Sequence, residues 1–155
     1  MKKKRSFLVG IIFSCLFFSC NEAPRSSIPN LPVDITLNLD FQDKDLLSLL
    51  ATESITKPRL AVERIGFGGV LVINGGYGID GQLMLFAYDL ACPVEANEKI
   101  TVIADNAGKA KCPVCGAVYN LISGSGNPES GSKYPLKTYS VFSVSGIGKQ
   151  YRILN

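Results

Sequence analysis

The chain has 155 residues, with 16 Lys and Arg against 13 Asp and Glu, and it contains neither His nor Trp. The absence of His excludes a Ser-His-Asp triad, an imidazole base and a His-ligated metal. Four of the basic residues lie within the first nineteen positions, which hold no acidic residue, so the remainder carries 12 minus 13 charges, or −1. A nucleic-acid partner therefore has no electrostatic support, and we expect none.

The N-terminus combines basic and apolar residues in the order typical of a secretory signal. Four basic residues at positions 2–5 precede an apolar stretch of thirteen residues, 7–19. A permanent membrane span needs about 17 to 25 apolar residues, so this stretch is too short. Residues 16–20 (LFFSC) resemble the lipobox of bacterial lipoproteins, although Phe17 stands where that motif usually has Leu.

The lipobox resemblance implies cleavage before Cys20 and diacylglycerol on its sulfur. We therefore expect a signal peptide at 1–19 and attachment to a membrane through the lipid. The predicted location is the bacterial cell envelope, on the periplasmic or cell-surface side. An uncleaved apolar anchor is the alternative, and it would also hold the protein on a membrane.

The segment that follows is predicted to lead from the lipid to a single domain. Residues 20–32 are rich in Pro, Ser and Asn and show no periodicity, which is typical of a flexible tether. The domain is expected over 33–155. Apolar residues alternate with polar ones from Val33 to Leu39, which predicts a half-buried strand. Residues 43–53 fit either one short helix or a loop that packs its leucines, and we expect the acidic residues at 40, 43 and 45 to be solvated.

From Leu60 onward the pattern predicts β-structure. Short apolar segments alternate with turn signals rich in Gly, Asn and Asp, and no internal repeat is present. Strands at this spacing are typical of an antiparallel β-sandwich or small barrel, so the predicted fold class is all-β. The predicted strands are 60–65, 69–74, 81–88, 100–104, 117–122, 138–144 and 150–155.

Three cysteines occur in the predicted domain, in two short motifs. Cys92 lies in the sequence ACPV, and Cys112 and Cys115 lie in CPVCG. Residues 100–111 between the motifs predict a β-hairpin with a turn at 105–108. Because a hairpin returns its two ends to the same place, we expect the two cysteine loops to be adjacent.

The order of motifs around these cysteines resembles the Rieske 2Fe-2S, or ferredoxin-like, domain. A Cys-Pro loop is followed by Cys-Pro-x-x-Gly-x-x-Tyr at 112–119, Gly-Asn-Pro at 126–128 and a Pro-Leu strand at 135–141. The resemblance covers about residues 83–154. It implies a Rieske-like β-fold in which Cys92 and Cys112 correspond to the ligands of the sulfur-ligated iron.

The sequence departs from the Rieske pattern at the other iron. The two His ligands of the family fall on Val94 and Cys115, and Ala117 replaces a serine that donates a hydrogen bond to the cluster. A Rieske centre needs two imidazoles on one iron, so this chain cannot build a standard one. The resemblance is therefore to a divergent member of the family.

Several interpretations of Cys92, Cys112 and Cys115 stay open. They could hold a single Zn or Fe with Glu95, Asp89 or water as the fourth ligand, or an atypical 2Fe-2S centre. In an oxidising compartment, Cys92 and Cys112 or the two cysteines of the C-x-x-C motif could form a disulfide. The C-x-x-C motif could instead exchange thiols with a partner, or the thiols could be buried in a module without metal.

The function predicted from these features is that of a lipid-anchored, Rieske-like lipoprotein related to iron-sulfur electron-transfer proteins. It would act with a redox partner protein, as an electron-transfer subunit of an oxidoreductase. The alternative is a non-redox binding or structural envelope lipoprotein with a cluster-free scaffold. No catalytic residue is predicted, and we expect no enzymatic activity from the protein alone.

Overall fold

The computed structural model describes residues 24–144 and 149–155, and the predicted signal peptide and Cys20 lie outside this range. The described part is all-β, as predicted, with one short 3₁₀ helix. The elements are β1 (Val33–Asn38), η1 (Lys44–Leu47), β2 (Thr52–Ile55), β3 (Arg64–Ile65), β4 (Val70–Tyr77), β5 (Leu83–Asp89), β6 (Ile103–Ala104), β7 (Lys109–Lys111), β8 (Val118–Asn120), β9 (Pro128–Ser130), β10 (Thr138–Ser143) and β11 (Gln150–Leu154).

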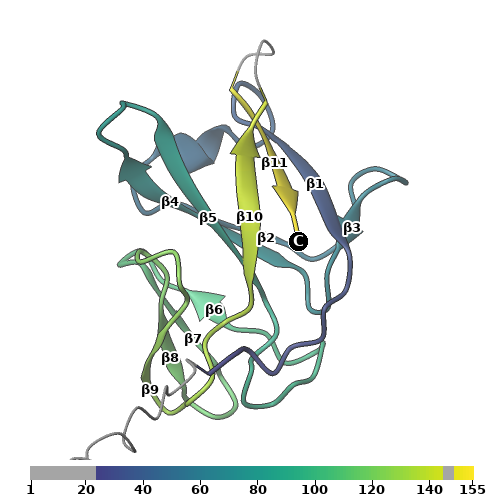
Figure 1. Cartoon of the computed structure of the whole chain (residues 1–155), viewed down its shortest axis with the longest axis vertical. Helices are drawn as coiled ribbons and strands as arrows, with labels where there is room; N and C mark the ends of the chain where they lie inside the picture. Colours follow the sequence, from purple (N-terminus) through teal and green to yellow (C-terminus); the bar gives the residue numbers. More distant parts are fainter. Residues whose placement is uncertain (1–23, 145–148) are drawn as a thin grey trace, which may run out of the picture.

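The strands form two antiparallel sheets (Figure 1). The larger sheet has the order β2-β4-β5-β10-β11-β1-β3 and curves into an incompletely closed barrel. The smaller sheet has the order β6-β7-β8-β9 and lies beyond one end of the barrel. The chain enters the small sheet after β5 and returns to the large sheet at β10, so the segment between them forms one continuous insertion.

The strand β4, which lies between β2 and β5, contributes side chains to both hydrophobic cores. Val70 and Val72 pack into the core of the large sheet, whereas Leu71 and Ile73 pack into the core shared with the small sheet. Successive side chains of a strand point to opposite faces, so a strand buried on both faces needs a continuous apolar run. The sequence VLVI at 70–73 supplies this run, and all four residues are fully buried.

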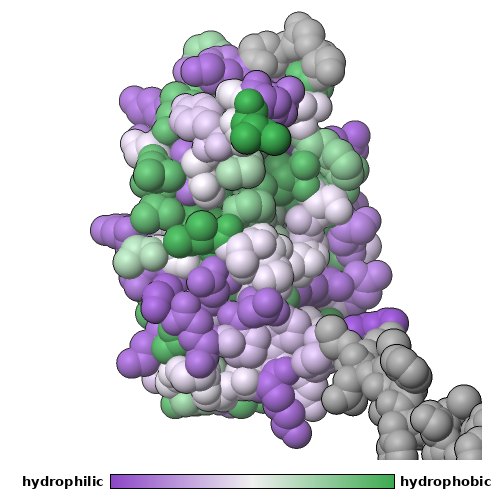
Figure 2. All heavy atoms as spheres, turned by 60° about the vertical axis from the view of Figure 1, so that its left-hand side comes forward, coloured by the Kyte–Doolittle hydropathy of each residue, from purple (hydrophilic) through white to green (hydrophobic). Residues whose placement is uncertain are grey.

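The large sheet opens between β5 and β10. These strands pair only at Tyr88 with Thr138 and at Ala87 with Tyr139, and they diverge beyond these pairs. Residues of both strands line the groove that results, among them Phe86 and the exposed Phe142. Figure 2 shows hydrophobic residues gathered in the upper half of the face that it displays, while the lower half is largely hydrophilic.

Two predicted segments differ from the structure. In 43–53 only η1 is helical, and Leu46 is buried while Leu49 is exposed. The strand predicted at 60–65 is reduced to β3, because the buried Glu63 carboxylate accepts hydrogen bonds from the N–H groups of Arg59 and Leu60 and stabilises a turn. The short strands β2 and β9 were not predicted.

The acidic residue Asp43 is not solvated, contrary to expectation. Its side chain is fully buried, accepts a hydrogen bond from the N–H of Asn38 at 2.6 Å, and pairs with Arg59 at 2.7 Å. Arg59 also pairs with Glu53. This charged cluster connects η1 and β2 to the turn that precedes β3.

Part of the predicted tether, just before β1, contacts the domain. Ile28 is buried, and the Ser27 hydroxyl donates a hydrogen bond to the carbonyl of Pro93, in the first cysteine loop. The Asn155 side chain donates to the carbonyl of Leu31 at 2.6 Å. Ile28 therefore packs into the domain, and Ser27 and Leu31 make hydrogen bonds to it while staying exposed. None of the helical segments within residues 24–144 and 149–155 has the length and apolar character of a membrane span.

Candidate metal centre

The first cysteine loop follows β5 and is fixed by backbone hydrogen bonds. The N–H of Cys92 donates to the carbonyl of Ile100, and the carbonyl of Cys92 accepts from the N–H of Ala96, both at 2.9 Å. An isolated bridge pairs Ala91 with Thr101 just outside the loop. The loop therefore closes on itself and holds Cys92 at its base, where the side chain is fully buried.

The second cysteine loop is the turn between β7 and β8. The N–H of Gly116 donates to the carbonyl of Cys112 at 3.0 Å, and the N–H of Cys112 donates to the carbonyl of Ala117 at 2.9 Å. Gly116 has a φ of 76°, a conformation that glycine adopts without steric cost. The predicted hairpin is confirmed, since β6 pairs with β7 and returns the chain to the Cys92 loop.

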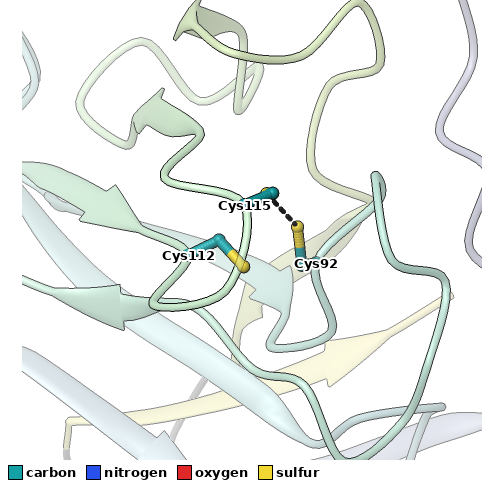
Figure 3. Close-up of side chains that lie close together, drawn as sticks. All are labelled: Cys92, Cys112 and Cys115. Carbon is teal, nitrogen blue, oxygen red and sulfur yellow. Dashed lines mark hydrogen bonds between the residues drawn. The ribbon is translucent and has the colours of Figure 1, made fainter.

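The three sulfurs form one cluster (Figure 3). All three lie within 4.8 Å of one another, and the Sγ atoms of Cys92 and Cys115 are 3.6 Å apart. Cys92 and Cys112 are buried, whereas Cys115 is exposed, and all three are free thiols in the structure. The predicted adjacency of the two loops is therefore confirmed.

The surroundings of Cys112 and Cys115 shift the pKa values of the two thiols in opposite directions. Burial of Cys112 opposes ionisation, but the N–H groups of Cys115 and Val114 that face its sulfur lower the pKa of this thiol below its ordinary value. Desolvation raises the pKa of Cys115 to about 11, and the neighbouring sulfurs of Cys112 and Cys92 add to the effect. Cys112 therefore ionises ahead of Cys115, which is the order expected when one thiolate already faces backbone donors.

The structure places the hydroxyl of Tyr119, the last residue of the motif at 112–119, beside the cluster. Its Oη atom is 3.6 Å from the Sγ of Cys92, on the buried side. Burial raises the pKa of Tyr119 above its ordinary value, so the phenol stays protonated. The position of Tyr119 in the Cys-Pro-x-x-Gly-x-x-Tyr motif was the sequence signal for this contact.

The carboxylates considered as a fourth ligand do not join the cluster. Asp89 is fully buried, and its oxygens accept hydrogen bonds from Phe67, Gly68, Ala91 and Tyr139 at 2.6–3.0 Å. These four donors occupy the carboxylate, so Asp89 is a structural residue, contrary to the expectation that it could bind metal. Among the described residues, the group of ligand atoms consists of the three sulfurs alone, without Glu95.

The three sulfurs fit a single ion better than a Rieske centre. Thiolates about 2.3 Å from a tetrahedral zinc lie roughly 3.8 Å from one another, close to the separation of Cys92 and Cys115. A Rieske centre needs two imidazoles on its second iron. One of those positions is the exposed aliphatic Val94, and the other is Cys115, in direct contact with Cys92. The residues present therefore do not fit a standard Rieske 2Fe-2S centre.

Comparisons with known proteins give a structural likeness only. No protein-family model matches the sequence, and no curated protein matches it. The chain is similar to a ferredoxin of Sphingomonas yanoikuyae B1, with 17% identity, a TM-score of 0.43, and coverage of 82% of this chain and 98% of the other. It is also similar to a putative NADH-dependent nitrite reductase small subunit from Mycobacterium tuberculosis, with 11% identity, a TM-score of 0.43, and coverage of 81% and 97%.

Proposed function

We propose that this protein is a lipid-anchored, Rieske-like domain that binds a single metal ion, zinc or iron, through Cys92, Cys112 and Cys115. The observation that carries the proposal is the convergence of three free sulfurs from two separate loops within 4.8 Å. Thiolate clusters of this kind favour zinc and iron. A water or a group from a partner would complete the tetrahedron at the exposed side.

The two loops are suited to hold such an ion without rearrangement. Each is closed by backbone hydrogen bonds around its cysteine, and the two form the end of a packed core. The backbone N–H groups that face the Cys112 sulfur stabilise its thiolate form. A bound ion would in turn favour the thiolates of Cys92 and Cys115, because metal binding displaces the thiol proton.

The proposed cellular setting follows from the N-terminal sequence. Lipid on Cys20 would hold the domain at a membrane of the bacterial cell envelope, on the periplasmic or cell-surface side. With iron in the site, the protein would pass electrons to a redox partner protein, in keeping with the Rieske-like sequence pattern. With zinc, the site would be structural or would present a Lewis acid at its open position.

Cobalt substitution tests the single-ion site. The full chain, expressed without export so that all five cysteines remain, is purified in detergent under reducing, oxygen-free conditions and titrated with Co²⁺. We expect saturation at one ion per chain, with sulfur-to-cobalt charge-transfer absorption and strong visible bands of a tetrahedral site. Cys92→Ser, Cys112→Ser and Cys115→Ser should each weaken these bands, whereas the matched control Cys15→Ser should retain them.

A second candidate function is a non-redox binding or structural lipoprotein with a metal-free scaffold. Val94 at one His position and Ala117 at the serine position favour it, since both replace polar groups of the Rieske pattern with aliphatic ones. In that case no cobalt bands would form and the unfolding midpoint would not change with Co²⁺. Membrane attachment has its own test, because Cys20→Ser should abolish labelling by a radioactive fatty acid during export.

A further inference from the structure

We propose that the cysteine cluster is redox-gated, with an external disulfide oxidant coupling Cys92 to Cys115 and thereby closing the metal site. This inference rests on the proposed metal-binding function. The gate is the pair Cys92 and Cys115, whose sulfurs are in contact across the two loops. Cys112 stays a thiol.

The contact between Cys92 and Cys115 identifies this pair. Their Sγ atoms are 3.6 Å apart, which is van der Waals contact, and the cysteines belong to different loops (Figure 3). The sequence pointed instead to Cys92 with Cys112 or to the C-x-x-C pair. The structure brings the end of the C-x-x-C turn, rather than its beginning, against the Cys92 loop.

Accessibility gives the order of the reaction. Cys115 is exposed, while Cys92 and Cys112 are buried. A disulfide in solution therefore reaches Cys115 first. The Cys92 sulfur is in contact with Cys115 from the buried side, so it is the group placed to complete the reaction.

The chemical steps balance with one disulfide oxidant of the type RSSR. The Cys115 thiol first loses its proton to the solvent, and the thiolate then attacks one sulfur of RSSR, which forms a Cys115–SR mixed disulfide and releases RS⁻. The Cys92 thiolate then attacks the Cys115 sulfur, which forms the Cys92–Cys115 bond and releases the second RS⁻. The two cysteines lose two electrons, RSSR gains them, and the two RS⁻ groups take up the protons of the cysteine thiols or, with metal bound, protons of the solvent.

The disulfide would remove two of the three metal ligands. Among the described His, Cys, Asp and Glu side chains, Cys112 would then be the one ligand left at the site, and one thiolate does not hold an ion on its own. Reduction of the disulfide would restore the three thiolates. The same bond would also link the loop after β5 covalently to the turn between β7 and β8.

Disulfide mapping tests this inference. The full chain in detergent is treated with oxidised glutathione, alkylated, digested and analysed by mass spectrometry. We expect a peptide that joins Cys92 to Cys115 and an alkylated Cys112. Cys112→Ser should still form the link, whereas Cys115→Ser should stop it. A link from Cys112 to either of the other two cysteines as the main product would overturn the proposal.

Metal measurements separate this inference from the proposed function. Reduced protein should bind one Co²⁺ per chain, oxidised protein should bind none, and dithiothreitol should restore binding. Loss of binding in the reduced protein would refute the metal site while leaving the mapped disulfide intact. Retention of the ion in protein that carries the Cys92–Cys115 bond would refute the gate and leave the metal site standing.

Discussion

Asp89 connects the end of β5 to the first cysteine loop and to β10. Its carboxylate accepts four hydrogen bonds. The donors are the N–H groups of Phe67, Gly68 and Ala91 and the hydroxyl of Tyr139. Asp89→Asn places an NH₂ group against these donors, and we expect it to lower the free energy of unfolding by about 3 kcal/mol. Urea denaturation measures this change.

Tyr139→Phe is the matched control for Asp89→Asn. It removes one hydrogen-bond donor and leaves the carboxylate with three others. It should therefore lower the free energy of unfolding by about 2 kcal/mol at most. An Asp89→Asn variant as stable as the unsubstituted protein would show that the four donors do not depend on the carboxylate.

Gly68 and Gly116 lie near the cysteines, and a side chain is unfavourable at each for a different reason: lack of space at Gly68 and a positive φ at Gly116. A Cβ on Gly68 would lie 2.6 Å from the backbone N of Ala91, next to Cys92, whereas a Cβ on Gly116 would meet nothing within 4 Å. Gly68→Ala should therefore displace the first cysteine loop, lower the free energy of unfolding by about 1–3 kcal/mol and weaken Co²⁺ binding. Gly116→Ala should lower the free energy of unfolding by about 1 kcal/mol, because Ala is strained at the positive φ of this position.

Gly116→Asn distinguishes these two causes, because Asn tolerates a positive φ better than Ala. It should recover part of the stability that Gly116→Ala loses, while Gly68→Asn should recover nothing. Equal losses for Ala and Asn at position 116 would contradict the conformational explanation.

At the scale of elements, the cluster formed by Asp43, Glu53 and Arg59 makes stability depend on pH. Burial raises the pKa of Glu53 from 4.5 to about 7, nearby Asp43 adds to the shift, and Arg59 opposes it. The folded state therefore keeps a proton that the unfolded state has released, and stability falls as pH rises from about 4.5 to 7.

Glu53→Gln should flatten this pH dependence. Urea unfolding at pH 5 and pH 8 measures it, with the exposed Glu98→Gln as the control that keeps the parental slope. An unchanged difference between the two pH values in Glu53→Gln would show that another group titrates in this window.

The elements that the sequence predicted are those with a strong apolar pattern. Alternation located β1, and the continuous run at 70–73 located β4, because these strands face one or two cores. The strand β2 was missed since its TESI sequence lacks apolar alternation and it lies at an edge of the large sheet. Leu60 and Val62 misled the prediction, because an apolar residue in an exposed turn carries the same local signal as one in a strand.

The part of the candidate site that local geometry determines was predictable from the sequence. The hairpin between the two cysteine motifs predicted that the loops are neighbours. The choice of Cys115 as the contact of Cys92 depends on how the two sheets pack. The hydrogen bond from Tyr139 to Asp89, fifty residues apart, depends on the pairing of β10 with β5 in the large sheet. Residue spacing in one sequence contains no record of that packing.

At the scale of the whole molecule, the N-terminal segment packs against the domain beside the first cysteine loop. Ile28 is 5% exposed, and Ser27 donates to Pro93 next to Cys92. Ile28→Ala should lower the free energy of unfolding by about 2 kcal/mol or more, as measured by urea denaturation. The control is Ile79→Ala at a fully exposed position, which should have no effect; equal stability of both variants would mean that the segment does not pack in solution.

The metal and acid-labile sulfide content of the full chain, purified without oxygen, shows whether three thiolates hold a single ion. We expect one zinc or iron per chain, no acid-labile sulfide, and loss of the ion in Cys112→Ser. Two irons with acid-labile sulfide would contradict the single-ion site in favour of an atypical 2Fe-2S centre. Reduced protein without any metal would contradict it in favour of a metal-free scaffold.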